Sequence, residues 1–423
     1  MRVLIVNTSE MTGGAAVAAR RLMEALNDSG VKARMLVRDK QSDAMTVAAV
    51  TPAWRMRWHF LWERLCIWLH LRLQRRHLFD IDIANSGADI TSHPWFQEAD
   101  IIHLHWVNQG MLSLKGIRRI LDSGKPVVWT MHDIWPATAI CHLTLECRHF
   151  EQACSHCRLL PGGGSNNDLA ARTWRRKQQL LDGRRITFVA CSQWLAAEAG
   201  KSALLHGQTV VSIPNAIDNH YRPADRAAAR QQLGLPADRK LILFVSQRVT
   251  NPYKGMDYLV EACRQIAAEK DATLSQAGVI ILGGHAEEIV SQLSLPAWPL
   301  GYVSDPQRIA LVYQAADVFV LPSLSENLPN TIMEAMACGV PCVGFRVGGI
   351  PEMIEHRTTG YVANYRDAAD LAQGIRYVLA EADSDTLRQA CLQKVAHNYS
   401  PQSVARRYTE IYEQAQRPKT MKG

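Results

Sequence analysis

The sequence has 423 residues, of which 47% are hydrophobic and 21% are charged, a composition typical of a globular protein with two or three domains. Its net charge of +7 is modest for this length, so total charge does not indicate nucleic-acid binding, and we expect no nucleic-acid partner. No apolar run reaches the roughly 18 residues of a membrane span, and the opening MRVLIVN is too short for a signal peptide. Together with ten cysteines scattered through predicted strands and helices, this indicates a cytoplasmic protein.

The chain opens with an apolar strand, Arg2 to Asn7, and a polar loop that leads into an amphipathic helix ending at Gly30. Gly13 and Gly14 fall where the loop meets the helix, a place where glycine lets a ligand or another backbone approach closely. The pattern does not match G-x-G-x-x-G, so it does not indicate a dinucleotide site. From spacing alone, a ligand-facing loop and a glycine needed only for chain geometry are equal alternatives.

The window from Trp54 to Phe79 has the most unusual composition of the chain. Trp54, Trp58 and Trp62 recur at helical spacing, and six arginines against one glutamate give the window a charge of +5. Tryptophan with arginine on an amphipathic helix is typical of a helix that lies on an anionic membrane surface. The alternative is a helix that packs on its own domain and has a solvated basic face. Contact with the inner face of a membrane, or with a lipid-linked acceptor, is therefore one of two open interpretations.

Two later apolar runs, 99–106 and 126–133, are predicted to be neighbouring strands that end in histidine and other polar residues. The carboxyl ends of parallel strands form the edge where ligands bind, so His105 and His132 are candidates for a site there. His103 lies in the same run, but lone histidines at strand ends are often hydrogen-bonded structural groups, and we keep that interpretation for it.

A loop of four cysteines follows directly, with the spacing C-x5-C-x6-C-x2-C over seventeen residues: Cys141, Cys147, Cys154 and Cys157. Four thiolates this close can converge on a tetrahedral zinc, and a C-x-x-C pair is the usual anchor. Four protein ligands leave no open position for catalysis, so a zinc here would be structural. The alternative is four unligated cysteines, because two of the spacings are irregular and His142, His149 and His156 offer other ligands.

The first half closes with the run 187–191, which we predict to be the last strand of its domain, and with the segment 213–218, IPNAID. We therefore predict an N-terminal domain over residues 1–212, a C-terminal domain over 213–398 and a C-terminal helix over 399–423.

The second half restarts the alternation of strands and helices with LILFVSQR, VIILGG and DVFVLP, which predicts a second parallel sheet. The loop after the first of these strands, 248–255, contains Arg248 and Lys254. Positioned cations stabilise the negative charge of a departing diphosphate without a metal. The alternative is a pair of exposed surface cations.

The most informative stretch is 321–352, which predicts a strand, a short helix stopped by Gly339 and Pro341, and another strand. Glu326 and Glu334 lie eight residues apart around the helix start, and a helix of that length spans about 12 Å, close to the length of a nucleotide sugar. Backbone N–H groups at the helix start attract a diphosphate, and an acid near each end accepts hydrogen bonds from hydroxyls. For two lone acids, a solvated helix face is the alternative.

The run SENLPNTIMEAMACGVPCVGFRVGGIPEMI closely resembles the E-x7-E region of the retaining, nucleotide-sugar-dependent glycosyltransferases of family 4, which have the GT-B architecture. The loop RVTNPYKG resembles the diphosphate clamp of that family, and TMHD around His132 resembles the motif whose histidine lines the catalytic cleft. Family members also carry a glycine-rich loop at the position of Gly13 and Gly14. The four-cysteine segment is similar to one found in a subset of the family.

This resemblance implies an α/β protein made of two Rossmann-like, doubly wound domains facing across a cleft, with the donor on the C-terminal one and the acceptor on the N-terminal one. It implies that Glu334 holds the donor ribose and that Glu326 and His132 position the transferred sugar. The residues that it implies for donor binding lie in the two loops described above: Arg248, Lys254, Asn327, Leu328, Asn330, Thr331 and Glu334. It implies acceptor or cleft contacts at Gly13, Gly14 and His105.

The implied function is transfer of a sugar from a nucleotide-sugar donor to a hydroxyl of a glycan or lipid-linked acceptor, in cell-surface polysaccharide biosynthesis and with no cofactor required for catalysis. Arg248, Lys254, Glu326 and His132 are the implied catalytic residues. Two alternatives stay open. A GT-B enzyme of the sugar-nucleotide epimerase type would need no acceptor, and a non-enzymatic, membrane-associated assembly protein would show no nucleotide-dependent change in melting temperature.

Overall fold

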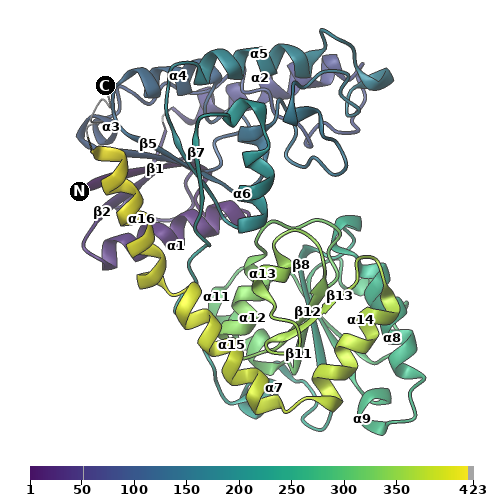
Figure 1. Cartoon of the computed structure of the whole chain (residues 1–423). Coiled ribbons are helices and arrows are strands. Elements are labelled where there is room, and N and C mark those ends of the chain that lie inside the picture. Colours follow the sequence, from purple (N-terminus) through teal and green to yellow (C-terminus); the bar gives the residue numbers. More distant parts are fainter. Residues whose placement is uncertain (51, 418–423) are drawn as a thin grey trace. The chain divides into compact units, whose positions relative to one another are not determined.

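The computed structural model describes residues 1–50 and 52–417 and divides into two compact units (Figure 1). Unit 1 comprises Met1–Ala216 with Pro401–Gly423, and unit 2 comprises Ile217–Ser400. Each unit is a parallel sheet covered by helices on both faces (Figure 1). The predicted fold class, two Rossmann-like α/β domains, is confirmed.

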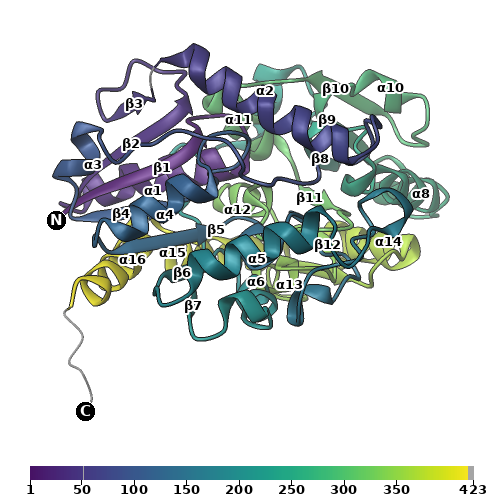
Figure 2. The same ribbon diagram turned by 90° about the horizontal axis from the view of Figure 1, so that it is seen from above.

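In the described part of unit 1 the sheet has seven strands in the order β3-β2-β1-β4-β5-β6-β7, and every neighbouring pair is parallel (Figure 2). The strands are β1 (Arg2–Ser9), β2 (Lys32–Asp39), β3 (Val47–Ala49), β4 (Ile101–Leu104), β5 (Val127–Met131), β6 (Thr187–Ala190) and β7 (Thr209–Ser212). The strand order reverses between β1 and β4, which is where parallel sheets bind ligands. Strand β7 shows that the prediction of 187–191 as the last strand was wrong, because its four residues, TVVS, carry too short an apolar signal.

Helices α1 (Gly14–Asp28) and α16 (Pro401–Gln416) pack on one face of this sheet. Helices α2 (Ala53–His70), α4 (Leu114–Asp122) and α5 (Leu169–Leu181) pack on the other. The shorter helical segments of unit 1 are α3 (Pro94–Glu98), α6 (Gln193–Gly200), η1 (Trp135–Ala137), η2 (His149–Glu151), η3 (Pro161–Gly163) and η4 (Ala203–Leu205). No helix of the described residues is both long and apolar enough to cross a bilayer.

The tryptophan- and arginine-rich helix ends earlier than predicted. The expected helix covered residues 54–79, but α2 stops at His70 and the chain continues in turns. Arg72, Leu73 and His77 adopt φ angles of 52°, 66° and 63°, which an α-helix does not tolerate. The last part of the basic segment therefore lies on a turn at the end of α2.

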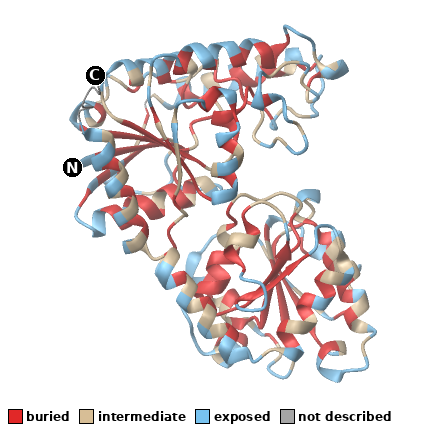
Figure 3. Cartoon of the chain, viewed as in Figure 1, coloured by how far each residue is buried: buried red, intermediate tan, exposed pale blue. Residues whose placement is uncertain are grey.

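Within its described residues unit 2 has six parallel strands in the order β10-β9-β8-β11-β12-β13. They are β8 (Leu241–Arg248), β9 (Gly278–Gly284), β10 (Ala297–Gly301), β11 (Val318–Leu321), β12 (Cys342–Phe345) and β13 (Gly360–Ala363). The order reverses between β8 and β11, so the loops after these two strands form the expected binding edge. The central strands are buried, as parallel strands covered on both faces must be (red in Figure 3).

The helices of unit 2 flank its sheet on both sides, with α8 and α14 on one side and α11, α12 and α15 on the other (Figure 1). They are α7 (Arg226–Leu233), α8 (Met256–Ala267), α9 (Ala272–Ser275), α10 (Glu287–Val290), α11 (Pro306–Ala315), α12 (Asn330–Ala337), α13 (Ile350–Met353), α14 (Ala368–Arg376) and α15 (Ser384–Asn398). Two further segments are the 3-10 turn η5 (Pro252–Lys254) and the π-helical turn η6 (Tyr377–Glu381).

Candidate active site

The loops that follow β8, β11 and β13 in unit 2 are tied together by hydrogen bonds. The backbone N–H of Leu324, after β11, donates to the carbonyl of Tyr253, after β8, over 2.8 Å. The hydroxyl of Tyr365, after β13, donates to the carbonyl of Leu324 over 3.1 Å. The carboxyl edge of this sheet therefore presents one connected group of loops.

Two glycines on neighbouring loops allow a close approach to the acidic loop after β11. A Cβ atom on Gly255 would lie 1.9 Å from the carbonyl oxygen of Pro322, and one on Gly348 would lie 1.7 Å from that of Glu326. Both glycines also have positive φ angles, of 68° and 57°. The acidic loop after β11 thus packs against the cationic loop at Gly255 and against the loop after β12 at Gly348, and both contacts require glycine.

Lys254 and Glu326 meet directly at this edge. The Nζ atom of Lys254 lies 2.5 Å from Oε1 of Glu326, and both side chains are only partly exposed. The sequence predicted a cation for a diphosphate and an acid for a sugar in these two loops, and the structure brings the two side chains together. An ion pair of this kind holds both groups in defined positions at the end of the central strands.

Arg248 is the last residue of β8, so it begins the loop that contains Lys254. Its Nε donates to the hydroxyl of Thr250 over 3.0 Å, and its backbone carbonyl accepts from the hydroxyl of Ser246 over 3.0 Å. These contacts fix the start of the loop. The guanidinium itself is exposed at the carboxyl edge of the sheet.

Glu334 is buried on α12 and is oriented by a partner that sequence analysis missed. Its Oε2 accepts a hydrogen bond of 3.1 Å from the hydroxyl of Tyr313, on α11. Burial, followed by the charge of Glu334, raises the pKa of Tyr313 well above its ordinary value, so the phenol stays protonated and donates. The helix start beside Glu334 carries the remaining predicted donor contacts, of which Leu328 is buried and the others are half-buried: Asn327, Leu328, Asn330 and Thr331.

A row of histidines lies at the carboxyl ends of β4 and β5 in unit 1, where His103 and His105 are buried and His132 is half-buried. Nδ1 of His105 lies 2.9 Å from Nε2 of His132, so the structure brings these two predicted residues together. His103 contacts the hydroxyls of Thr130 and Tyr412 over 2.8 Å each, which supports the structural interpretation that we kept for it. Burial lowers the pKa of His132 to about 4 and that of His103 to about 3, and it lowers the pKa of His105 strongly as well. These imidazoles are therefore neutral near pH 7.

The predicted glycine loop lies at the start of α1. Gly13 precedes the helix with a φ angle of 93°, and a Cβ atom there would meet nothing within 4 Å. Backbone conformation, and not crowding, is what requires glycine at this position. Gly14 is the first residue of the helix.

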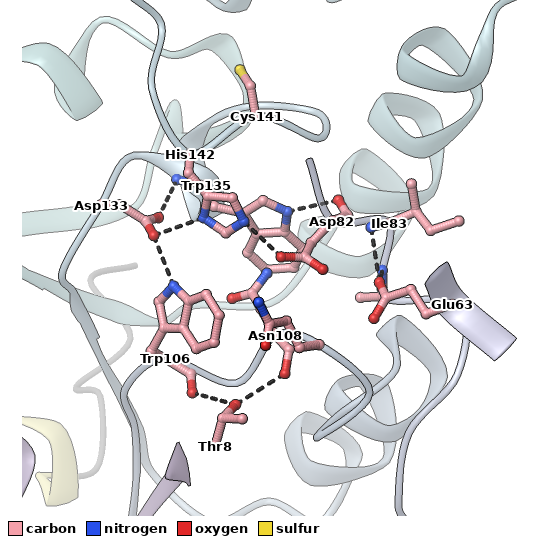
Figure 4. Close-up of polar contacts among 12 residues, drawn as sticks. Thr8, Glu63, Asp82, Ile83, Trp106, Asn108, Asp133, Trp135, Cys141 and His142 are labelled. Atoms are coloured by element: carbon pink, nitrogen blue, oxygen red, sulfur yellow. Dashed lines mark hydrogen bonds and ion pairs between the residues drawn. The ribbon is translucent and has the colours of Figure 1, made fainter. Parts of the chain in front are cut away.

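His142, which sequence analysis considered only as an alternative metal ligand, is instead held between two carboxylates (Figure 4). Its Nδ1 lies 2.7 Å from Asp133 and its Nε2 lies 2.7 Å from Asp82. Burial alone would lower the pKa of His142, but the two carboxylates raise it to about 10, so the ring is an imidazolium. Because both ring nitrogens are engaged, His142 is not available as a zinc ligand. Trp106 donates to Asp133 over 2.8 Å, which fixes the residue next to His132.

The same buried cluster extends to the inner face of α2 (Figure 4). Arg64 pairs with Asp82, and Glu63 accepts hydrogen bonds from the backbone N–H groups of Ile83 and Ala84 over 3.0 and 2.6 Å. Burial, with the charge of Asp82, raises the pKa of Glu63 to about 7. Helix α2 is therefore anchored to the domain by buried charges.

The four predicted zinc ligands are half-buried, free thiols. Among the residues that the structure describes, no group of three or more His, Cys, Asp or Glu side chains could hold a metal ion. Burial raises the pKa of Cys154 and Cys157 to about 12, and the other thiols of the loop add to the effect. The loop is braced by Asp168, which accepts from the N–H of Cys157 over 2.9 Å, and the zinc site stays a prediction.

Comparison with known families agrees with this architecture. Residues 12–221 match the family model described as Glycosyltransferase Family 4, and residues 239–381 match the one described as Glycosyl transferases group 1. One curated relative is the D-inositol 3-phosphate glycosyltransferase of Geodermatophilus obscurus, 34% identical over 187 residues, which cover 42% of this chain and 41% of that protein. Another is the N-acetyl-alpha-D-glucosaminyl L-malate synthase of Bacillus anthracis, 27% identical over 210 residues, which cover 48% and 53%. The chain thus spans about half the length of these relatives, or less.

Solved structures share the fold over nearly the whole chain. A sucrose-phosphate synthase from Thermosynechococcus elongatus has a TM-score of 0.64 and 20% identity, with 98% of this chain and 99% of that one covered. HepE of Anabaena, solved in complex with UDP-glucose, has a TM-score of 0.62 and 18% identity, with 98% and 100% covered. The family models cover both domains in the order seen in the chain, and the fold agrees. The chain therefore belongs to the glycosyltransferases of family 4.

Proposed function

We propose that this protein transfers a sugar from a nucleotide-sugar donor to an acceptor hydroxyl and retains the configuration of the anomeric carbon. The observation that carries the proposal is the contact of Lys254 with Glu326 at the carboxyl edge of the unit 2 sheet, 2.5 Å apart. A cation suited to a departing diphosphate and an acid suited to sugar hydroxyls are thereby held side by side. UDP-sugars are the first donors to test, because the Anabaena protein of the same fold was solved with UDP-glucose.

Each group at this edge has a role in the proposed reaction. Lys254 and Arg248 stabilise the negative charge that develops on the diphosphate as the bond to the sugar breaks. Glu334, held by Tyr313, accepts hydrogen bonds from the ribose hydroxyls, and Glu326 accepts them from the sugar. No side chain is assigned as a covalent nucleophile, so the acceptor hydroxyl attacks on the face that the leaving group departs from, assisted by the leaving phosphate.

Unit 1 is proposed to bind the acceptor. Its half-buried His132 is a neutral imidazole held by His105, so it can orient a hydroxyl without adding a positive charge. We propose a glycan or lipid-linked acceptor of cell-surface polysaccharide synthesis, met by a peripheral enzyme at the inner face of the membrane. A small hydroxylated acceptor is the second candidate, because the curated relatives are named for inositol phosphate and malate. Offering both classes with a donor and identifying the product by mass spectrometry separates them.

The test of the donor site uses thermal stabilisation and kinetics together. UDP-sugars at about a hundred times their dissociation constant should stabilise the protein by about 2.7 kcal/mol. Replacing the clamp lysine, K254Q, should lower kcat by roughly 10²–10³ and change KM much less, because the lysine acts on charge that appears in the transition state. The matched control is K270Q, an exposed lysine of the same unit. Equal turnover of the two variants would contradict the proposed role of Lys254.

A further inference from the structure

Helix α2 carries apolar side chains on two opposite faces. Its inner face, with Met56, Glu63, Arg64 and Ile67, is buried against the domain. Its outer face exposes six large apolar side chains: Trp54 (67%), Trp58 (60%), Leu61 (49%), Trp62 (43%), Leu65 (42%) and Leu69 (55%). At 3.6 residues per turn these six positions fall within an arc of roughly 100°. A helix on the surface of a globular domain normally places polar residues there, so the outer face needs a partner.

Arginines border this stripe. Arg55 and Arg57 are exposed and lie on either side of it, because each is rotated by about a quarter of a turn from the midline of the stripe, in opposite directions. The turn after the helix adds five more exposed residues, each either an arginine or a large apolar residue: Arg72, Leu73, Arg75, Arg76 and Phe79. We call these residues and the six apolar ones the outer α2 patch. It is apolar in the middle and cationic at its edges and at one end.

The patch is held rigidly from behind. A Cβ atom on Gly110 would lie 2.5 Å from the backbone nitrogen of Phe60, so the helix backbone packs directly on that loop. Nδ1 of His59 lies 2.7 Å from the hydroxyl of Ser86, and Arg64 donates to the carbonyl of Leu78 over 2.7 Å. With buried Arg64 also paired with Asp82, the helix cannot rotate its outer face inward without breaking these contacts.

We propose that the outer α2 patch docks unit 1 on an anionic lipid bilayer. The tryptophans and leucines lie in the boundary between headgroups and acyl chains, and the arginines contact lipid phosphates. Charge complementarity favours this partner: the patch contains five exposed arginines, whereas the acid of α2, Glu63, is buried on the inner face. The docking surface itself is argued from α2 alone. Its role of bringing the enzyme to a lipid-linked acceptor rests on the proposed function.

Vesicle co-sedimentation tests the proposal with the full chain. Phosphatidylcholine vesicles are compared with vesicles that also contain phosphatidylglycerol, at low and high salt. The unmodified protein should bind the anionic vesicles, less so at high salt. The double variant W58E/W62E should weaken binding about tenfold or more. Its control is M45E, which places one glutamate on the highly exposed Met45 of unit 1, outside the patch, and should bind normally.

A second pair of variants tests the arginines. R55Q/R57Q should weaken binding to anionic vesicles about tenfold or more and reduce its salt dependence, because each cation near an anionic surface contributes separately. K115Q/R118Q removes two exposed charges from α4 of the same unit and should leave binding unchanged. Quenching of tryptophan fluorescence by lipids with brominated acyl chains should be strong in the unmodified protein and reduced in W58E/W62E.

Three outcomes would overturn the proposal: no preference for anionic vesicles, binding that W58E/W62E leaves unchanged, or a dimer of the unmodified protein that W58E/W62E dissociates while vesicles bind neither. Circular dichroism and the UDP-sugar thermal shift are measured on each variant without lipid. An intact donor response with no vesicle binding refutes the docking surface alone. Vesicle binding without any donor response refutes the proposed function alone.

Discussion

At the scale of single residues, the buried carboxyl group of Glu63 links protonation to folding. Its pKa is raised to about 7 from an ordinary value near 4.5, so the native state holds this proton more tightly than the unfolded chain does. Its contribution to stability is therefore greatest below pH 4.5 and declines as the pH rises to about 7. Replacing the carboxyl by an amide, E63Q, removes this loss, so the free energy of unfolding of E63Q should rise relative to the unmodified protein across that window by up to about 3 kcal/mol.

Urea unfolding at a series of pH values measures this difference. The amide oxygen of E63Q can still accept from the backbone N–H groups of Ile83 and Ala84, so the packing of α2 is preserved. E24Q, at an exposed glutamate of α1, is the matched control and should show no such pH dependence. Parallel stability curves for E63Q and the unmodified protein would show that the buried carboxyl does not titrate in this window.

The residues of the proposed donor site were predictable where they lie in a short motif directly after a central strand. Lys254 and Glu326 follow strands that a parallel sheet places side by side, so their contact follows from topology. Tyr313 was not predicted, because it lies 21 residues before its partner Glu334 on another helix. The contact of His142 with Asp82 was missed for the same reason, since these two residues lie 60 positions apart. Contacts of this kind depend on packing, which local patterns do not encode.

At the scale of elements, the four-cysteine loop gives a prediction that metal analysis can settle. If the loop holds zinc, purified protein should contain about one zinc per chain, and C154S/C157S should lose it and unfold at a lower temperature, because structural zinc contributes directly to folding free energy. C66S changes a half-buried cysteine outside the loop and should keep the metal. Protein purified without chelators that contains no zinc would leave four unligated thiols as the correct interpretation.

Element boundaries were harder to predict than element types. The apolar runs correctly predicted the central strands of both sheets, because strands buried on both faces leave a continuous apolar signal. The predictions were wrong at the edge strand β7, which was missed, and at the end of α2, which was placed too late in the chain. In β7 the strand is short and only partly buried, and after His70 the helical spacing of apolar residues continues although the backbone turns left-handed at Arg72. Backbone conformation of a non-glycine residue has no reliable local signature.

At the scale of the whole molecule, the chain forms two compact units, and the last described helix belongs to the first of them. Helix α16 packs on the unit 1 sheet, where the hydroxyl of Tyr408 contacts Thr130 over 2.9 Å and that of Tyr412 contacts His103 over 2.8 Å. Unit 1 is therefore closed by a segment that the chain supplies only after unit 2 is complete. Its stability depends on the C-terminal helix, whereas the residues of the proposed donor site all lie in unit 2.

This arrangement predicts two separable responses in calorimetry. Y412F leaves the buried Nδ1 of His103 without its partner, which should cost about 1–3 kcal/mol and lower the melting temperature of unit 1. A UDP-sugar should raise the melting temperature of unit 2 and leave that of unit 1 in place. Y302F, at an exposed tyrosine of unit 2, is the control and should change neither. If Y412F and the UDP-sugar instead shift the same single transition, the two units unfold as one cooperative body. Units that unfold independently would each show a transition that only one of the two changes shifts.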